Sequence, residues 1–171
     1  VNVVQIFGTV DPAKVNDYTE YMAAVNMYEA LTTLDSSGSI KPLLAESWDV
    51  SADTLTYTFK LKSGATFLDG SPVEAKDVVY SVNSLLALNE GPSYLFEGVL
   101  DENSVSAVGN DKVEFKLKKV YTPFLTNTPI LFVVNSDVAE SNKTSSDPWA
   151  QDFIANNTIG AGAFKMTNWE R

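Results

Sequence analysis

Thr54-Leu-Thr-Tyr-Thr-Phe-Lys-Leu61 alternates strictly between polar and apolar side chains. Successive side chains of a β-strand point to opposite faces, so this period of two produces one apolar face and one hydroxyl-rich face. The segment is therefore predicted to be a half-buried strand. Its predicted neighbours are residues 43–50, which lie across the turn Ser51-Ala-Asp53, and the short run Ala65-Thr-Phe67.

A helix is predicted to follow this strand. After the tight-turn pair Asp69-Gly70, the sequence Ser71-Pro-Val-Glu74 has the pattern of a capping box, with serine at the N-cap and proline at the first helical position. Apolar side chains then recur at helical spacing, at Val78, Val82, Leu85 and Leu86. The pattern predicts a helix over residues 72–88.

The remaining elements are predicted in the same way. An earlier helix is expected over residues 17–32, with Asp17 as its cap and Glu20 three residues later. Strands are expected at residues 3–7, 105–108, 113–120, 130–134 and 160–166, and short helices at residues 137–142 and 148–156. The turn Gly109-Asn-Asp111 makes two of these strands a hairpin. The fold class is α+β with mainly antiparallel pairing.

Composition excludes several classes of function. The 171 residues carry 12 basic and 22 acidic side chains, which gives a net charge of −10, and there is no cysteine or histidine. Nucleic-acid binding needs clustered cations, and an anionic membrane would repel this chain. Thiol catalysis, a Ser-His-Asp triad and the usual zinc ligand sets are also excluded. No cofactor and no metal site are expected.

The motifs that bear chemistry are weak when taken alone. No spacing selects a catalytic pair from the acidic side chains Glu46, Asp49, Asp69, Glu74 and Asp77. Gly160-Ala-Gly162 precedes a predicted strand without the lysine and hydroxyl pair of a phosphate loop, so close packing or a hinge explains it better. Asn142-Lys-Thr144 and Asn156-Asn-Thr158 are formal glycosylation acceptors, but such triplets arise often by chance.

Tyrosines are the most promising binding residues. A tyrosine ring packs against a ligand while its hydroxyl group selects a hydrogen-bond partner, so tyrosines beside loops often line binding clefts. Tyr18 and Tyr94 stand in such places, although a partly buried core position is an equally good interpretation of each. For Tyr21, Tyr28 and Tyr80, which fall within predicted helices, the core interpretation is favoured.

A resemblance to a known family accumulates in order along the chain. It is carried by Tyr28-Glu-Ala-Leu31, Leu43-Leu-Ala-Glu-Ser-Trp48, Leu55-Thr-Tyr-Thr-Phe-Lys-Leu61, Phe67-Leu-Asp-Gly-Ser-Pro72, Ala75-Lys-Asp-Val78, Tyr80-Ser81 and Ile159-Gly-Ala-Gly-Ala-Phe-Lys-Met-Thr-Asn-Trp169. Together these segments resemble the peptide/nickel/dipeptide-type solute-binding proteins of ABC importers, the extracellular solute-binding proteins of family 5. The resemblance covers essentially the whole chain.

The resemblance implies a division of the chain. The fold would be periplasmic-binding-protein-like (type II, cluster C), with residues 1–42 and 159–171 in the first lobe and residues 43–158 in an inserted β-rich subdomain. In that subdomain Trp48 and Phe59 would be buried. Because family members are much longer, the chain is expected to be an N-terminal fragment that lacks the second lobe.

The resemblance also implies the site and the partners. Ligand contacts would come from Asn16, Tyr18 and Glu20 in the segment 14–20, and from Ser93 and Tyr94 after the capped helix. The partners would be a peptide or other small solute and the membrane permease of the importer. The protein would be a monomer and not an enzyme, and would lie in the periplasm or outside the cell as a membrane-anchored lipoprotein.

Two other functions remain as alternatives. A hydrolase of cell-wall polymers would need a pair of carboxyl groups facing each other across a cleft, and the sequence selects no such pair. A β-rich surface adhesion domain would need neither the capped helix nor the ordered family segments. Both alternatives are therefore weaker than a solute-binding protein.

Overall fold

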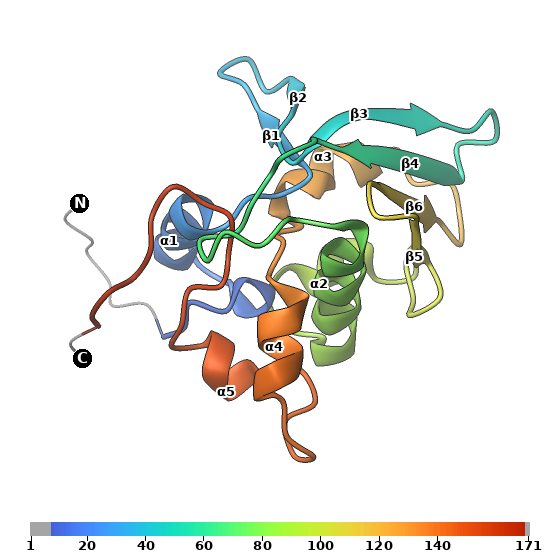
Figure 1. Cartoon of the computed structure of the whole chain (residues 1–171). Helices are drawn as coiled ribbons and strands as arrows, with labels where there is room; N and C mark the ends of the chain where they lie inside the picture. Colours follow the sequence, from blue (N-terminus) through green and yellow to red (C-terminus); the bar gives the residue numbers. More distant parts are fainter. Residues whose placement is uncertain (1–7, 170–171) are drawn as a thin grey trace.

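The computed structural model describes residues 8–169, in which the strands come in two groups, β1–β4 and β5–β6, with helices before, between and after them (Figure 1). The elements, including the 3₁₀ turns η1–η3, are η1 (Pro12–Lys14), α1 (Tyr18–Met27), β1 (Thr32–Leu34), β2 (Ile40–Pro42), β3 (Ala45–Val50), β4 (Thr56–Leu61), α2 (Ala75–Leu88), η2 (Gly91–Phe96), β5 (Val105–Val108), β6 (Lys112–Lys116), α3 (Phe124–Asn127), η3 (Thr128–Ile130), α4 (Ser136–Asn142) and α5 (Gln151–Ile154). The strand predicted at residues 3–7 lies outside the described residues.

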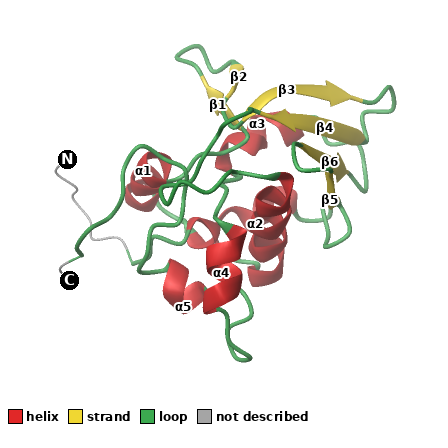
Figure 2. Cartoon of the chain, viewed as in Figure 1, coloured by secondary structure: helices red, strands yellow, loops and turns green. Residues whose placement is uncertain are grey.

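A four-stranded antiparallel sheet is built around the predicted strand β4. Its order is β3-β4-β6-β5, and one face packs on α2 (Figure 2). Phe59 on β4 lies opposite Trp48 on β3 and Val113 on β6. The inward side chains of β4 are buried, and Phe59 meets Phe115 edge-on at 5.6 Å between ring centroids. The period of two and the hairpin between β5 and β6 are thus confirmed, and Trp48 is half-buried against the same core.

The start of α2 corrects the predicted capping box. The N-cap is Glu74, not Ser71, and the side chain of Asp77 accepts a hydrogen bond from the Glu74 N–H at 2.8 Å. The Ser71 hydroxyl instead donates to Asp69 at 2.6 Å, in a turn around Gly70, whose φ is +87°. This turn keeps Pro72 extended in a β-bridge with Thr66, so the helix begins only after it.

The first helix ends earlier than predicted. Asp17 caps α1 as expected, accepting the Glu20 N–H at 2.8 Å, but the helix stops at Met27 rather than at residue 32. From Tyr28 the chain is extended, because Ala30 forms a bridge with Phe132 and β1 pairs with β2. The apolar side chains of residues 28–31 are buried by this extended pairing and not by a helical face.

Three predicted strands do not form. Residues 65–67 make one bridge back to Pro72, and β6 takes their expected place beside β4. Residues 130–134 are buried but contain only the end of η3 and the Phe132 bridge. Residues 160–166 pair with no strand among residues 8–169; their backbone lies against the end of α1, with Gly162 N–H donating to Met27 O at 3.1 Å.

Glycine explains this close approach. A Cβ atom added at Gly160 would lie 2.3 Å from Met27 O, and one at Gly162 would lie 2.6 Å from Asn26 O, distances that backbone atoms do not tolerate. The close-packing interpretation of these two glycines is therefore confirmed. Two hydrophobic clusters result: one joins the sheet to α2, and the other joins α1 to α4, α5 and residues 159–169.

Candidate functional site

The two segments expected to contact ligand are in contact, although residues 21–89 separate them in the sequence. The turn η2 packs on η1, and Gly91 lies against the backbone of η1 and of Val15, which follows it. Its φ is +48°, and an added Cβ would lie 2.7 Å from Ala13 O and 2.9 Å from Val15 O. An ion pair of 3.6 Å between Lys14 Nζ and Glu90 Oε1 also joins the segments. The start of the first segment is therefore held against the start of the second, and the two segments are together called the loop wall (residues 14–20 and 90–94).

Two tyrosine side chains of the loop wall are exposed. Tyr18 begins α1 with 77% of its surface accessible, and Tyr94 in η2 has 70% accessible. The core interpretation of both residues is thus wrong. It is confirmed for Tyr28 and Tyr80, which are buried, and for Tyr21, which is half-buried against the same hydrophobic cluster. An exposed tyrosine can place its ring on a ligand while its hydroxyl stays available for a hydrogen bond.

Asn16 is exposed, and Glu20 holds it in place. The Glu20 carboxylate is buried, with 6% of the residue accessible, and accepts the Asn16 N–H at 2.9 Å and the Gly8 N–H at 3.3 Å. Both oxygens are therefore engaged by the backbone of the chain. Ser93 is also buried, and its N–H donates to Glu90 O at 3.1 Å. Within the loop wall, Asn16, Tyr18 and Tyr94 are the predicted contacts that face solvent.

A hollow of about 600 Å³ lies behind η2. Its lining includes Asn83, Asn89, Ser93, Glu97 and Asp101. Hydrogen bonds from the Asn103 N–H and the Ser104 hydroxyl, together with Lys118, hold the pKa of Asp101 below its usual range. A glycosidase acid requires the opposite shift, so Asp101 gives no support to the hydrolase alternative.

Asp11 has a raised pKa but no room for a substrate. Burial is the main cause, and it raises the pKa to about 6 although the Ala13 N–H donates to the carboxylate at 2.9 Å. The side chain caps η1 and lines a space of only about 20 Å³. Asp11 therefore stabilises η1, where the first segment of the loop wall begins, and is not placed for catalysis.

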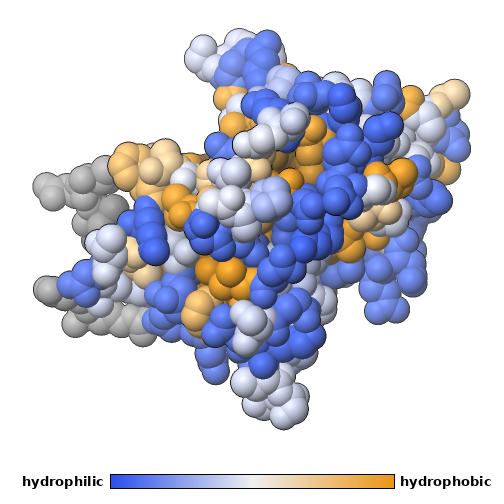
Figure 3. Space-filling view, viewed as in Figure 1, coloured by the Kyte–Doolittle hydropathy of each residue, from blue (hydrophilic) through white to orange (hydrophobic). Residues whose placement is uncertain are grey.

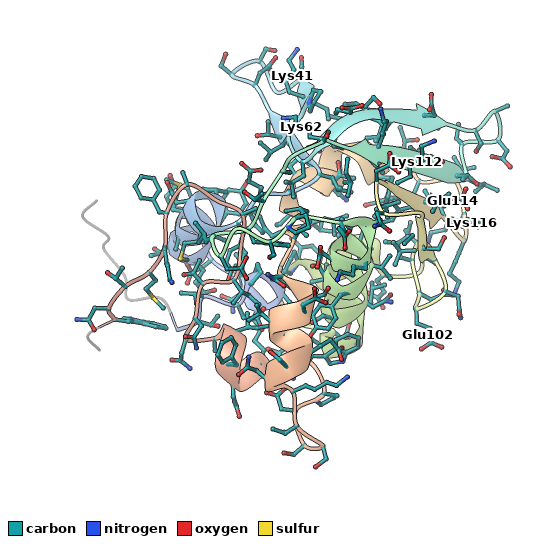
Figure 4. The ribbon with its side chains drawn as sticks, in the orientation of Figure 1. Lys41, Lys62, Glu102, Lys112, Glu114 and Lys116 are labelled. Atoms are coloured by element: carbon teal, nitrogen blue, oxygen red, sulfur yellow. The ribbon has the colours of Figure 1, made fainter. Side chains whose placement is uncertain are left out.

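Cations gather away from the loop wall. Figure 4 shows Lys41 on β2, Lys62 after β4, and Lys112 and Lys116 on β6, all at the hairpin and sheet. Lys14, in the loop wall itself, is paired with Glu90. Across residues 8–169, no group of three or more acidic side chains is arranged to hold a metal ion, and no helix is long and apolar enough to span a bilayer.

Sequence reasoning missed a polar connection between α2 and α4. The second oxygen of Asp77 accepts both the N–H and the hydroxyl of Ser136, at 2.9 and 2.6 Å. Asn135, the cap of α4, donates to Asp69 and Ser71 at 3.1 and 2.9 Å. The segments that carry the resemblance thus include residues whose role is to join helices. Gly91 was missed as well, although a glycine immediately before a proline after a helix was an available signal.

Comparison with known proteins identifies the family. A model described as bacterial extracellular solute-binding proteins, family 5 Middle, matches residues 39–171. This chain belongs to the family 5 solute-binding proteins. The suspected resemblance is thereby confirmed.

Family 5 relatives match most of the chain. The probable D,D-dipeptide-binding periplasmic protein DdpA of Escherichia coli is 30% identical over 170 residues, which cover 95% of this chain and 32% of DdpA. The dipeptide-binding protein DppE of Bacillus subtilis is 31% identical over 85% of this chain and 28% of its own length. The chain thus spans about a third of the curated relatives it matches. Their names describe binding proteins and not enzymes.

Solved structures of the family share the fold. NikZ from Campylobacter jejuni, solved in complex with Ni(L-His), superposes with a TM-score of 0.82 at 26% identity, over 98% of this chain and 32% of its own. The ABC transporter substrate-binding protein CtaP from Listeria monocytogenes gives 0.82 at 30% identity, over 98% and 33%. The expected α+β fold of the type II periplasmic-binding-protein kind is confirmed.

Proposed function

We propose that this chain forms one side of the solute site of an ABC-importer binding protein, and that the solute is an oligopeptide or a related small molecule. The observation that carries the proposal is the loop wall, where Tyr18 and Tyr94 are exposed on two segments whose backbones approach closely at Gly91. Related proteins named for dipeptide binding support the peptide class. The family description, extracellular solute-binding proteins, supports a location in the periplasm or outside the cell.

Cleft closure is the proposed mechanism. A solute that contacts the loop wall and a second lobe at once would stabilise the closed arrangement, and the permease would receive the solute from that state. In the division we propose, residues 1–42 and 159–171 form part of the first lobe and residues 43–158 form the inserted subdomain. The hydrogen bonds from residues 162 and 164 to the end of α1 support placing the first and last segments together. The protein acts as a monomer anchored through a lipid.

The loop wall is proposed to contact the uncharged part of the ligand, because its own charged side chains are already paired. With Lys14 paired to Glu90 and the carboxylate of Glu20 engaged by backbone N–H groups, the wall offers the side chains of Asn16, Tyr18 and Tyr94. Such a surface suits the neutral backbone and side chains of a peptide. In this proposal the charged ends of the peptide are held by the second lobe.

Peptide titration of the intact binding protein tests the proposal. Tyr18→Ala and Tyr94→Ala should each weaken binding of a peptide that the protein retains, by about tenfold, because an aromatic contact contributes on the order of 1–2 kcal/mol. Val108→Ala, which shortens an exposed apolar side chain on the outer strand β5, is the control and should leave the affinity unchanged. Unchanged affinity in both tyrosine variants would refute the assignment of the loop wall.

A further inference from the structure

The chain contains two Asn-X-Thr triplets, and the structure treats them differently. The first, Asn142-Lys-Thr144, begins at the last residue of α4 and runs into the connection to α5. That connection protrudes at the lower end of the molecule in this view, opposite the β1–β2 hairpin at the top (Figure 1). The space-filling view shows hydrophilic and neutral atoms there (Figure 3). The second triplet, Asn156-Asn-Thr158, follows α5.

Every residue of the first triplet is exposed. The Asn142 amide donates to Val138 O at 2.9 Å and to Ser141 Oγ at 3.3 Å, both at the surface, where water replaces such bonds at little cost. Lys143 leaves the helix with φ −70° and ψ 153°, an extended conformation. The Thr144 hydroxyl lies within 3.2 Å of Ser146 Oγ and accepts the Asp147 N–H at 3.0 Å, and unlike Thr158 it is exposed. A transferase can therefore reach both the amide and the hydroxyl.

The second triplet is closed at its threonine. Thr158 has only 8% of its surface accessible, and its hydroxyl donates to Met27 Sδ at 3.4 Å and accepts the Met166 N–H at 3.1 Å. Exposing this hydroxyl would detach the segment that follows it from α1. Each buried hydrogen bond left unmade costs about 1–3 kcal/mol, so the folded protein keeps this triplet out of reach.

We propose that Asn142 is an acceptor for N-linked glycosylation of the folded protein and that Asn156 is not. The donor is an oligosaccharide linked to a lipid diphosphate. The Asn142 amide nitrogen forms a bond to the sugar C1 as the bond from C1 to the diphosphate oxygen breaks. The lipid diphosphate leaves with the electron pair of that bond, and the proton lost by the amide passes to the solvent. Nothing is oxidised or reduced.

An acidic residue near Asn142 offers the transferase an additional charged contact. Glu140 lies two residues before Asn142 on the same short helix, and its carboxylate is exposed and paired with Lys143. A surface pair of this kind contributes little to stability, so a cation of a transferase can replace Lys143 at low cost. The corresponding position before Asn156 is Ile154, which is buried. Accessibility and charge therefore favour the same triplet.

The test uses the folded full-length chain with an oligosaccharyltransferase that accepts folded substrates and a purified lipid-diphosphate-linked oligosaccharide. Intact mass spectrometry should show one added glycan, and peptide mapping should place it on Asn142. Asn142→Gln should abolish the mass shift, whereas Asn156→Gln should leave it in place. Thr144→Val should also abolish it and Thr144→Ser should retain it, because only the serine keeps the hydroxyl.

Two results would overturn the proposal. One is an unmodified chain in a reaction where a flexible peptide carrying Glu-Ser-Asn-Lys-Thr is glycosylated. The other is a glycan on Asn156 in the folded Asn142→Gln variant. Circular dichroism of each variant checks that the fold is retained, and the Asn156→Gln and Thr144→Ser variants keep the test informative if another variant fails to fold.

Discussion

Replacing Gly91 with alanine tests how the loop wall is built. An added Cβ would lie 2.7 Å from Ala13 O and 2.9 Å from Val15 O, and these are backbone atoms that cannot rotate away. The φ of +48° adds a conformational penalty of about 1 kcal/mol for any residue with a Cβ. Overpacking of this kind typically costs a further 1–3 kcal/mol. Gly91→Ala should therefore lower the free energy of unfolding by about 2–4 kcal/mol.

Gly38 supplies the matched control. Its φ is +78°, but an added Cβ would meet nothing within 4 Å, so Gly38→Ala carries only the conformational penalty of about 1 kcal/mol. Urea denaturation followed by circular dichroism gives both values under the same conditions. The intact binding protein carrying Gly91→Ala should also lose peptide affinity, because the two segments of the loop wall separate. Equal destabilisation by the two substitutions would refute the claim that Gly91 locks η2 onto η1.

Two further predictions concern buried carboxylates. Asp77→Ala should lower the free energy of unfolding by about 2–4 kcal/mol, because it leaves the N–H groups of Glu74 and Ser136 without their acceptor. The control is Asp137→Ala, which removes an exposed ion pair with Lys76 and should cost less than about 1 kcal/mol. Equal losses for the two variants in urea denaturation would contradict this prediction. The pKa of Asp11 is about 6 in the folded protein and 3.8 in the unfolded chain, so the folded state binds more protons between pH 3.8 and 6. The contribution of Asp11 to stability is therefore complete below pH 4 and is lost as the pH rises through 6. Asp11→Asn should remove this dependence of stability on pH, which amounts to about 1–3 kcal/mol in the free energy of unfolding between pH 4 and 7. Identical pH profiles for the variant and the parent in thermal or urea unfolding would show that the pKa of Asp11 is not raised.

The sheet and α2 were predictable because local pattern and tertiary burial agree there. Alternation along residues 54–61 survives in β4, since one face of the sheet packs on α2 while the other faces water. The end of α1 was not predictable in this way. Residues 28–31 are apolar enough to continue a helix, and the partners that hold them extended, Phe132 and the strand β2, come later in the chain.

The N-cap of α2 was misjudged because two capping patterns compete, one that starts at Ser71 and one that starts at Glu74. Ser71 fits a capping box in the sequence, but its hydroxyl is taken by Asp69, and the true box uses Glu74 and Asp77. The glycines at 160 and 162 resemble the entry to a strand, whereas they serve a backbone contact that depends on α1. Both errors arise where a distant segment of the chain selects between locally acceptable conformations.

The candidate site was predictable in position and only partly in detail. The family resemblance indicates both segments of the loop wall, but helical spacing cannot show that Tyr18 is exposed while Tyr28 is buried. It also could not show that the Glu20 carboxylate is turned inward to hold Asn16, because that arrangement requires the folded path of residues 8–16.

Native mass spectrometry tests the central claim most directly. The intact binding protein would be purified gently, weighed in its native state, and then denatured so that any released molecule is identified. A solute-binding protein of the peptide class should carry a ladder of short peptides, and Tyr18→Ala combined with Tyr94→Ala should reduce the amount retained. A protein that arrives empty and binds no peptide on addition, with the tyrosines intact, would contradict the account.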